Sequence, residues 1–274
     1  MTETTVITRQ SADPALSVRG LAKTYGTGEN ARIVLADVTF DVFPGETVCI
    51  VGPSGAGKTT LLRCLAGLLP RTAGTVMLGA TEVVSPPERL AVVFQDYSRS
   101  LMPWTTVRAN VDLPLRRIKE LSKADRRRRA NDALASVGLE GCEDLHPWQL
   151  SGGMQQRVAI ARALAYEPSV LLMDEPFASV DAQTRADLED LTHAIKARYD
   201  VTILVVTHDI EESVYLSDRV IVLSGSPTGV TSIVPIGLSY PRDQVTTKSM
   251  AEFAELRAKI LGMVRRSATT GDES

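Results

Sequence analysis

A glycine-rich stretch sets the strongest constraint on how this chain can fold. Residues 52–60 fit the phosphate-loop pattern GxxxxGK[ST] without a mismatch. They are Gly52, Pro53, Ser54, Gly55, Ala56, Gly57, Lys58, Thr59 and Thr60. The apolar run 47–51 before them predicts a buried strand, and residues 58–69 after them predict a helix that ends before Pro70. Because the motif requires this strand and this helix, the context favours a phosphate-binding loop over a Gly-rich surface turn.

The chemistry of these residues predicts a site for a polyphosphate and Mg²⁺. Glycine has no Cβ, so the backbone N–H groups of the loop can turn inward onto phosphate oxygens. The N-terminus of the following helix adds a favourable dipole. We expect Lys58 to hold the β- and γ-phosphates and the hydroxyl group of Thr59 to ligate Mg²⁺.

Composition excludes several other classes of protein. A length of 274 residues suits one large domain or two small ones, and 44% hydrophobic residues are sufficient for a core. The net charge of −3 argues against a general nucleic-acid binder. The three cysteines lack metal-ligand spacing, which fits a reducing compartment. The sequence shows neither a signal peptide nor an apolar run of about 18 residues, so we expect a chain that is not exported and does not itself span a membrane.

The second half of the chain predicts an α/β fold with a mostly parallel sheet. The apolar runs 170–173, 201–206 and 219–223 alternate with helical segments, which favours parallel pairing. Ligands of such sheets bind at the carboxyl ends of the strands. Several candidate site residues follow predicted strands and are therefore expected to converge: Gly52, Gln95, Asp174 and His208.

The rest of the chain divides around this phosphate-loop core. We predict a flexible tail at 1–14, a phosphate-loop domain at 15–224 and a C-terminal extension at 225–274. Short strands early in the domain predict an N-terminal antiparallel β subdomain, and residues 96–150 predict an inserted helical subdomain. The extension is expected to be turn-rich and to close with an amphipathic helix. The apolar stripe of that helix is expected to pack on the body: Met250, Phe253, Leu256, Ile260 and Val264.

Two acidic residues follow the apolar run 170–173. Asp174 stands where a Walker B carboxylate would order Mg²⁺, and Glu175 beside it can polarise an attacking water as a general base. A lone Asp-Glu pair is a weak signal, but after four apolar residues and an upstream phosphate loop it is strong. His208, at the end of the next strand, could contact the γ-phosphate, although an isolated histidine is more often structural.

The stretch LSGGMQQR at 150–157 resembles the signature motif of ATP-binding cassette (ABC) proteins, and the other motifs then follow in that family's order over residues 16–224. The resemblance implies binding of ATP and Mg²⁺. It implies that Tyr25 stacks on adenine and that His208 is catalytic rather than structural. It also implies that Gln95, a catalytic and metal-contacting residue, joins the site to the helical subdomain. The residues expected to bind nucleotide beyond the phosphate loop are Tyr25, Ser151, Gly152, Gly153 and Asp181, with Ser151 and Gly153 on the γ-phosphate of an opposite subunit. Ala178-Ser179-Val180-Asp181 departs from the SALD of many relatives, but valine keeps the apolar character.

Residues 95–110 and 225–265 resemble importer cassettes of the nitrate, sulfonate and taurine group. This resemblance implies the ATP-hydrolysing subunit of a bacterial importer, peripheral on the cytoplasmic face of the inner membrane. Its partners would be a second cassette, most simply an identical copy, separate permease subunits and, indirectly, an external solute-binding protein, with no nucleic acid. The alternatives are a soluble cassette ATPase of another class and an exporter cassette. Trp104 is expected either at a permease-docking surface or in the helical subdomain core.

Overall fold

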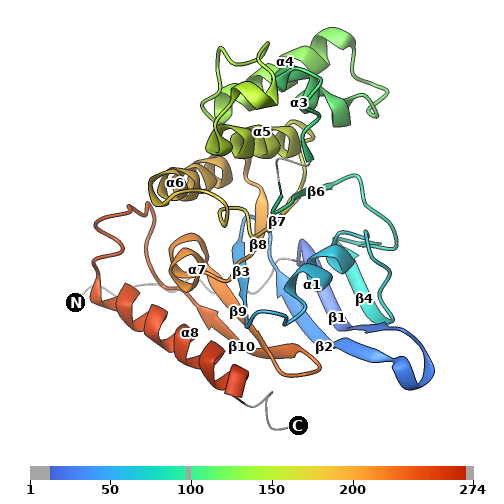
Figure 1. Ribbon diagram of the computed structural model, residues 1–274, viewed down its shortest axis with the longest axis vertical. Helices are drawn as coiled ribbons and strands as arrows, with labels where there is room; N and C mark the ends of the chain where they lie inside the picture. The colour runs from blue at the N-terminus through green and yellow to red at the C-terminus, as the bar shows by residue number, and fades with distance from the viewer. Residues whose placement is uncertain (1–12, 97–99, 270–274) are drawn as a thin grey trace.

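The computed structural model describes residues 13–96 and 100–269, and three parts are visible in it (Figure 1). A mainly parallel sheet occupies the centre, an antiparallel sheet lies beside it, and a group of helices lies at one end. The predicted α/β fold with an antiparallel β part and an inserted helical part is therefore confirmed. Most of the predicted flexible tail lies outside the described residues.

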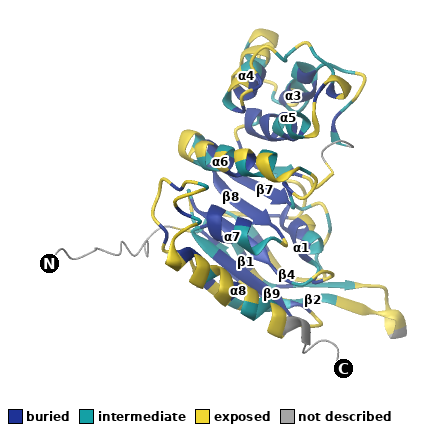
Figure 2. Ribbon diagram, turned by 60° about the vertical axis from the view of Figure 1, so that its left-hand side comes forward, coloured by how far each residue is buried: buried dark blue, intermediate teal, exposed yellow. Residues whose placement is uncertain are grey.

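The central sheet has six strands in the order β10-β9-β3-β8-β7-β6. Their bounds are β3 (Thr47–Val51), β6 (Leu90–Val93), β7 (Val170–Asp174), β8 (Thr202–Val206), β9 (Arg219–Ser224) and β10 (Gly229–Pro235). All neighbouring pairs are parallel except β9 and β10. Every residue of β3, β7 and β8 is buried, because the sheet is covered on both faces (Figure 2). This explains the continuous apolar runs in the sequence.

The antiparallel sheet has the order β2-β1-β4-β5. Its strands are β1 (Leu16–Tyr25), β2 (Arg32–Val42), β4 (Ala73–Leu78) and β5 (Thr81–Glu82), and a 3₁₀ turn η1 (Gly28–Asn30) joins the first two. β1 and β2 are longer than the short strands that the sequence predicts, since irregularities in their pairing break the alternating pattern. One face of the central sheet, with Ile50 and Leu204, packs with this sheet and α1 in a single core.

Helix α1 (Lys58–Leu65) is shorter than predicted. The sequence predicts a helix to residue 69, but Gly67 takes a φ of +67° and the chain turns there. The N–H groups of Leu68 and Leu69 both donate to the carbonyl of Arg63, which closes the helix. A glycine two positions after the last helical residue thus ends the helix before Pro70 does.

The remaining helices cover the other face of the central sheet and form the helical part. They are α3 (Val107–Leu115), α4 (Lys123–Ser136), α5 (Gly152–Ala165), α6 (Ala182–Tyr199), α7 (Ile210–Leu216) and α8 (Ala251–Thr269), with a 3₁₀ turn η2 (Pro147–Gln149). Ser122 and Asp181 cap α4 and α6, because their side chains accept hydrogen bonds from the N–H groups of Asp125 and Thr184. Helices α3, α4 and α5 pack on one another at the end of the molecule farthest from α8 (Figure 1).

The C-terminal extension contains a strand that is not predicted from the sequence. β10 lies within the stretch expected to be turn-rich, and it pairs with β9, so the predicted boundary at 224 falls between two strands of one sheet. Helix α8 packs on the body as expected: Phe253 is 1% exposed and Ile260 is fully buried. The prediction is wrong for Met250, which precedes the helix and is 43% exposed. No helix within residues 13–96 and 100–269 is both long and apolar enough to cross a membrane.

Candidate nucleotide site

The carboxyl ends of the central strands bring the predicted catalytic residues together. In the register of β7 and β8, Asp174 lies opposite Val206, and the N–H of Glu175 donates to the carbonyl of Val206 at 2.7 Å. The N–H of Thr207 donates to the carbonyl of Ile50 on β3 at 3.1 Å. The residues that follow β7 and β8, among them Glu175 and His208, therefore lie at one edge of the sheet, as expected for a parallel α/β fold.

Close packing of the phosphate loop requires glycine at two of its positions. Gly57 is the N-cap of α1 with a φ of +69°, and a Cβ there would lie 2.7 Å from Cγ1 of Val34. A Cβ on Gly52 would lie 2.8 Å from the carbonyl oxygen of Leu223. The loop is thus held between the antiparallel sheet and β9, with the backbone N–H groups at the start of α1 available to an anion.

Lys58 lies inside the phosphate loop. Its ammonium donates to the carbonyls of Gly52 at 2.9 Å and Pro53 at 3.0 Å, and the residue is only 7% exposed. Burial lowers the pKa of Lys58, while the charges of Glu175 and Asp174 act in the opposite direction. The ammonium is therefore pre-positioned where a phosphate group would lie against the loop.

Thr59 and Asp174 form the pair expected to hold Mg²⁺. Oγ1 of Thr59 donates to Oδ1 of Asp174 at 3.3 Å, and Asp174 is 4% exposed. Burial raises the pKa of Asp174, and the bond from Thr59 partly offsets that effect. A buried carboxylate beside a hydroxyl group is a set of hard oxygen donors that fits Mg²⁺. The residues present therefore suit the metal that the motif implies.

Glu175 is the centre of a second polar cluster. Its Oε2 accepts a hydrogen bond from Nε2 of Gln95 at 3.2 Å and lies 3.1 Å from Nδ1 of His208. Glu175 also has a φ of +43°, which is unusual for a residue with a long side chain. Such conformations occur where surrounding structure holds them, often at functional sites. Gln95 thus contacts the carboxylate of Glu175, and its predicted role as a metal contact stays a prediction.

The other predicted nucleotide contacts lie apart from this cluster. Tyr25 ends β1 with its ring 43% exposed and the ammonium of Lys23 5.1 Å above the ring. Ser151 caps α5 in the helical part, which Figure 1 shows at a distance from α1. Gly153 packs so closely on Thr184 that a Cβ would collide with it. One chain therefore does not bring residues 151–153 to its own phosphate loop.

Asp209 and Arg185 are two residues near the site that the sequence motifs do not indicate. Asp209 follows His208, accepts hydrogen bonds from the N–H groups of Glu211 and Glu212 and so caps α7. Nη1 of Arg185, on the first turn of α6, lies 3.2 Å from Oδ2 of Asp209. An Asp before a short helix with Glu in its first turn is a capping signal that could have identified Asp209. Arg185, the partner of Asp209 on α6, has no comparable signal in the sequence.

Comparison with known proteins decides the family. The profile described as ABC transporter matches residues 35–178, which is more than half of the chain. The chain belongs to the ABC transporter family. It is an ATP-binding protein of that family, whose members hydrolyse ATP to power transport.

Individual relatives of this ABC protein agree with the profile. An uncharacterized ABC transporter ATP-binding protein of Methanocaldococcus jannaschii is 46% identical, with 91% of each chain covered. The nitrate transport protein NasD of Klebsiella oxytoca is 38% identical over 90% of this chain and 95% of its own. The aliphatic sulfonates import ATP-binding protein SsuB of Bacillus licheniformis is also 38% identical, over 90% and 93%. These relatives place the ABC protein in the importer group.

Solved structures extend the comparison to three dimensions. A dimeric ATP-binding cassette in a post-hydrolysis state, bound to ADP and Pi, superimposes with a TM-score of 0.71 at 33% identity. The match covers 82% of this ABC protein and all of that chain. The fold assigned above is therefore that of an ABC ATPase cassette.

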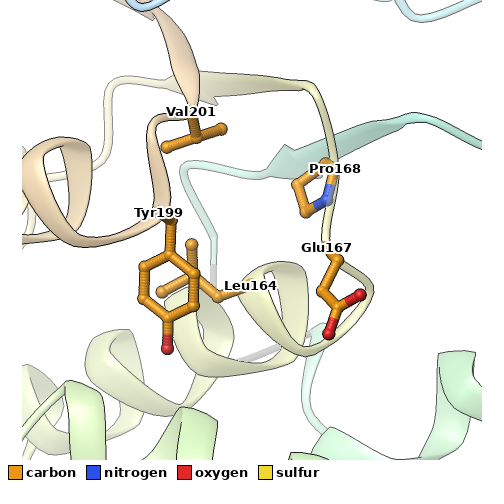
Figure 3. A pocket seen from close by; sticks show the side chains of 5 residues that line it. All are labelled: Leu164, Glu167, Pro168, Tyr199 and Val201. Carbon is orange, nitrogen blue, oxygen red and sulfur yellow. The ribbon is translucent and has the colours of Figure 1, made fainter.

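A small pocket lies away from the nucleotide site. It has a volume of about 100 Å³ and is lined by Leu164, Glu167, Pro168, Tyr199 and Val201 (Figure 3). Its walls come from the ends of α5 and α6 and from the residues just before β7 and β8. It therefore opens at the amino edge of the sheet, opposite the edge that carries Glu175 and His208.

Proposed function

We propose that this chain is the ATP-hydrolysing subunit of an importer for a small solute. The observation that carries the proposal is the Glu175 cluster, in which one carboxylate contacts both Gln95 and His208. Asp174, the adjacent residue, contacts Thr59 at the start of α1. A candidate base and a candidate metal pair thus lie side by side at the end of a phosphate loop, as ATP hydrolysis requires.

Each side chain of the site has a distinct task in this proposal. Lys58 and backbone N–H groups of residues 54–60 bind the β- and γ-phosphates. Thr59 and Asp174 would hold Mg²⁺, with Gln95 near it, and the bound metal would supply positive charge against the phosphate oxygens. Glu175 accepts a proton from the attacking water. His208 contacts the γ-phosphate and, through its hydrogen bond, orients Glu175.

A second cassette completes each site in this proposal. Ser151 caps α5, so the free N–H groups of Gly152 and Gly153 lie at a helix N-terminus that is suited to an anion. This helix belongs to the helical part and does not lie on its own phosphate loop. A head-to-tail pair of identical chains would place it on the partner's γ-phosphate twice, and the dimeric cassette of similar structure supports such a pair.

The helical part offers a surface for membrane subunits. Trp104 is 74% exposed, which contradicts the alternative that it is buried in the core of this part, although nearby Leu101 is 3% exposed. Trp148, two residues before the signature motif, is 70% exposed. Large exposed aromatic residues are typical of surfaces that a partner covers. We assign them to contact with permease subunits at the cytoplasmic face of the inner membrane.

The relatives suggest the class of solute. The names of two of them refer to nitrate and to aliphatic sulfonates, which are both oxyanions. By analogy we assign this chain to import of a nitrate-, sulfonate- or taurine-like solute that an external binding protein delivers. The solute itself would be selected by the permease and binding protein.

Purification of the chain from its own cells tests the proposal. A tagged chain should be recovered from detergent-solubilised membranes with integral permease subunits. In liposomes, the complex should transport an oxyanion only when ATP is present on the side of the membrane that carries the cassettes. Recovery with ribosomes, DNA-repair proteins or an Fe–S assembly complex would instead support the soluble alternative. Outward transport of the solute would support an exporter.

A further inference from the structure

A buried arginine of the C-terminal extension contacts the end of α7. Arg242 is 8% exposed, and its Nη1 donates to three carbonyl oxygens at the end of α7. The acceptors and distances are Val214 at 3.2 Å, Tyr215 at 2.7 Å and Ser217 at 2.9 Å. Its other terminal nitrogen, Nη2, donates to the carbonyl of Leu238 at 3.1 Å. The ring of Tyr240 lies 4.3 Å from Cζ. One guanidinium group therefore joins the extension to the end of a helix.

This contact is suited to fixing α7. The last carbonyls of a helix lack partners within it, and a positive charge at that end also complements the helix dipole. α7 has only 7 residues, and helices this short depend on contacts outside themselves for their position. Its two ends are held by Asp209, the N-cap, and by Arg242.

The start of α7 adjoins the candidate catalytic residues. His208 directly precedes the N-cap Asp209, and its Nδ1 lies 3.1 Å from Glu175. Helix α7 is about 10 Å long at 1.5 Å per residue. A tilt or shift at its carboxyl end is therefore transmitted over a short, stiff element to the residue that contacts Glu175.

A second tie from the extension joins α7 to α6. The ammonium of Lys248 lies 3.1 Å from Glu189 on α6 and 3.4 Å from Glu211 on α7. Nε2 of Gln244 donates to the carbonyl of Ala186 at 3.1 Å and to Glu189 at 3.0 Å. Helix α6 begins at the predicted nucleotide contact Asp181. The extension thus holds together the two helices that begin at predicted site residues.

We propose that Arg242 is a positioning residue for His208 and acts through α7, with Lys248 as a weaker second tie. The proposal rests on the role of His208 in the proposed function. The extension would then be needed for turnover, although the contacts of Arg242 and Lys248 are with α7 and α6.

Variants of the full chain test this assignment. Arg242→Gln removes the charge and most of the carbonyl contacts. We expect kcat for ATP to fall about 10-fold, while KM and the affinity for a fluorescent ATP analogue change less than 2-fold. Arg242→Lys, which keeps a cation, should recover part of the rate. Hydrogen exchange without nucleotide should become faster in residues 207–216 of Arg242→Gln and unchanged in the strands.

A double-mutant cycle separates positioning from general damage. His208→Ala sets the rate without the histidine, and adding Arg242→Gln to it should slow the enzyme by less than 2-fold more. If the two losses multiply, or if folded Arg242→Gln keeps the wild-type kcat, the assignment is wrong. A wild-type-like rate in His208→Ala alone would instead overturn the proposed role of His208. That result can be told apart from both outcomes that contradict the role of Arg242.

Lys248→Met provides a second test if Arg242→Gln does not fold. Lys248 is half-buried, so its replacement removes the tie between α6 and α7 with little effect on packing. A 2- to 3-fold loss of kcat that disappears in the His208→Ala background is expected. Lys259→Met, on the exposed face of α8, is the matched control and should behave as wild type. An unchanged kcat in Lys248→Met would overturn the proposal.

Discussion

Nδ1 of His208 lies 3.1 Å from Oε2 of Glu175, the oxygen that also accepts a hydrogen bond from Gln95. The histidine comes from the end of β8 and the glutamate from the end of β7, and the neighbouring register of these strands creates the contact. A carboxylate held from two sides is restricted in its rotamers. Such restriction favours a base that is aligned before the substrate binds.

Replacement of Glu175 by glutamine tests this alignment. Glu175→Gln keeps the size of the side chain but removes the proton acceptor, so hydrolysis should slow by roughly 10²–10⁴-fold. ATP binding should persist, and the ATP-bound dimer should accumulate in size-exclusion chromatography because closure no longer ends in hydrolysis. Near-normal turnover in the intact transporter would assign the base to another residue.

Tyr25→Ala should affect nucleotide binding more than turnover. The ring is 43% exposed, and one of its neighbours is the ammonium of Lys23, so a large aromatic surface remains for a base to stack on. Stacking reads the π face and not the hydrogen-bonding edge of a base. The variant should therefore raise KM for ATP more than it lowers kcat, and wild type should also hydrolyse GTP. Unchanged affinity would show that Tyr25 serves only packing.

Trp104→Ala should weaken the complex with the permease. Because the side chain is 74% exposed, its loss should leave the fold and ATP binding of the isolated chain intact. Less permease should be recovered with the tagged variant, or ATP hydrolysis should continue without uptake. Trp148→Ala is a matched variant of another exposed tryptophan in the helical part, and it shows whether the two act on the same partner. Poor yield of folded Trp104→Ala would contradict this assignment.

Mixing two inactive variants tests whether the site is shared between chains. Lys58→Ala removes the phosphate-loop cation, and Ser151→Arg blocks the N-terminus of α5. Each should be inactive alone, whereas a heterodimer has one site in which an intact Lys58 faces an intact Ser151. Partial ATPase activity on mixing is expected. Heterodimers that form but stay inactive would mean either that the sites are not shared between chains or that both sites must be intact for hydrolysis.

His193 predicts an acid-dependent loss of stability. Burial, followed by the charge of Arg242, lowers the pKa of His193 to about 4 from an ordinary 6.5. His193 thus resists protonation in the folded state. Its contribution to the free energy of unfolding is complete above pH 6.5 and is lost as the pH falls toward 4. The loss attributable to this residue is at most about 3 kcal/mol.

Urea unfolding of wild type and His193→Gln between pH 7 and pH 4.5 measures this contribution. Buried acids such as Glu189 and Glu212 titrate in both proteins and cancel in the difference. The free energy of unfolding of His193→Gln should decline less steeply with acid than that of wild type. Equal slopes would show that His193 does not resist protonation.

Much of the site was accessible from the sequence because its signals are local. The phosphate loop, the Asp174-Glu175 pair and His208 each follow an apolar run, and the rule that parallel strands end at one edge predicts their convergence. Strand β10 was missed because its Gly, Thr, Ser and Pro residues are typical of turns, and only its pairing with β9 makes it a strand. Arg242 lies in the stretch 225–265 that resembles importer cassettes, but its carbonyl acceptors at the end of α7 lie more than 20 residues earlier in the chain. Such a contact depends on tertiary packing and produces no periodic pattern in the sequence.

The position of β3 in the sheet has a consequence for synthesis of the chain. β3 carries the phosphate loop at its end, yet its two neighbours are β8 and β9, about 150 residues later. At ribosomal rates of 5–20 residues per second, roughly 10–30 s pass before those partners emerge. During that time a strand whose residues are all buried in the final fold has no sheet to join and is exposed to aggregation. The nascent chain should therefore depend on chaperone binding near residue 50 until the last strands leave the ribosome.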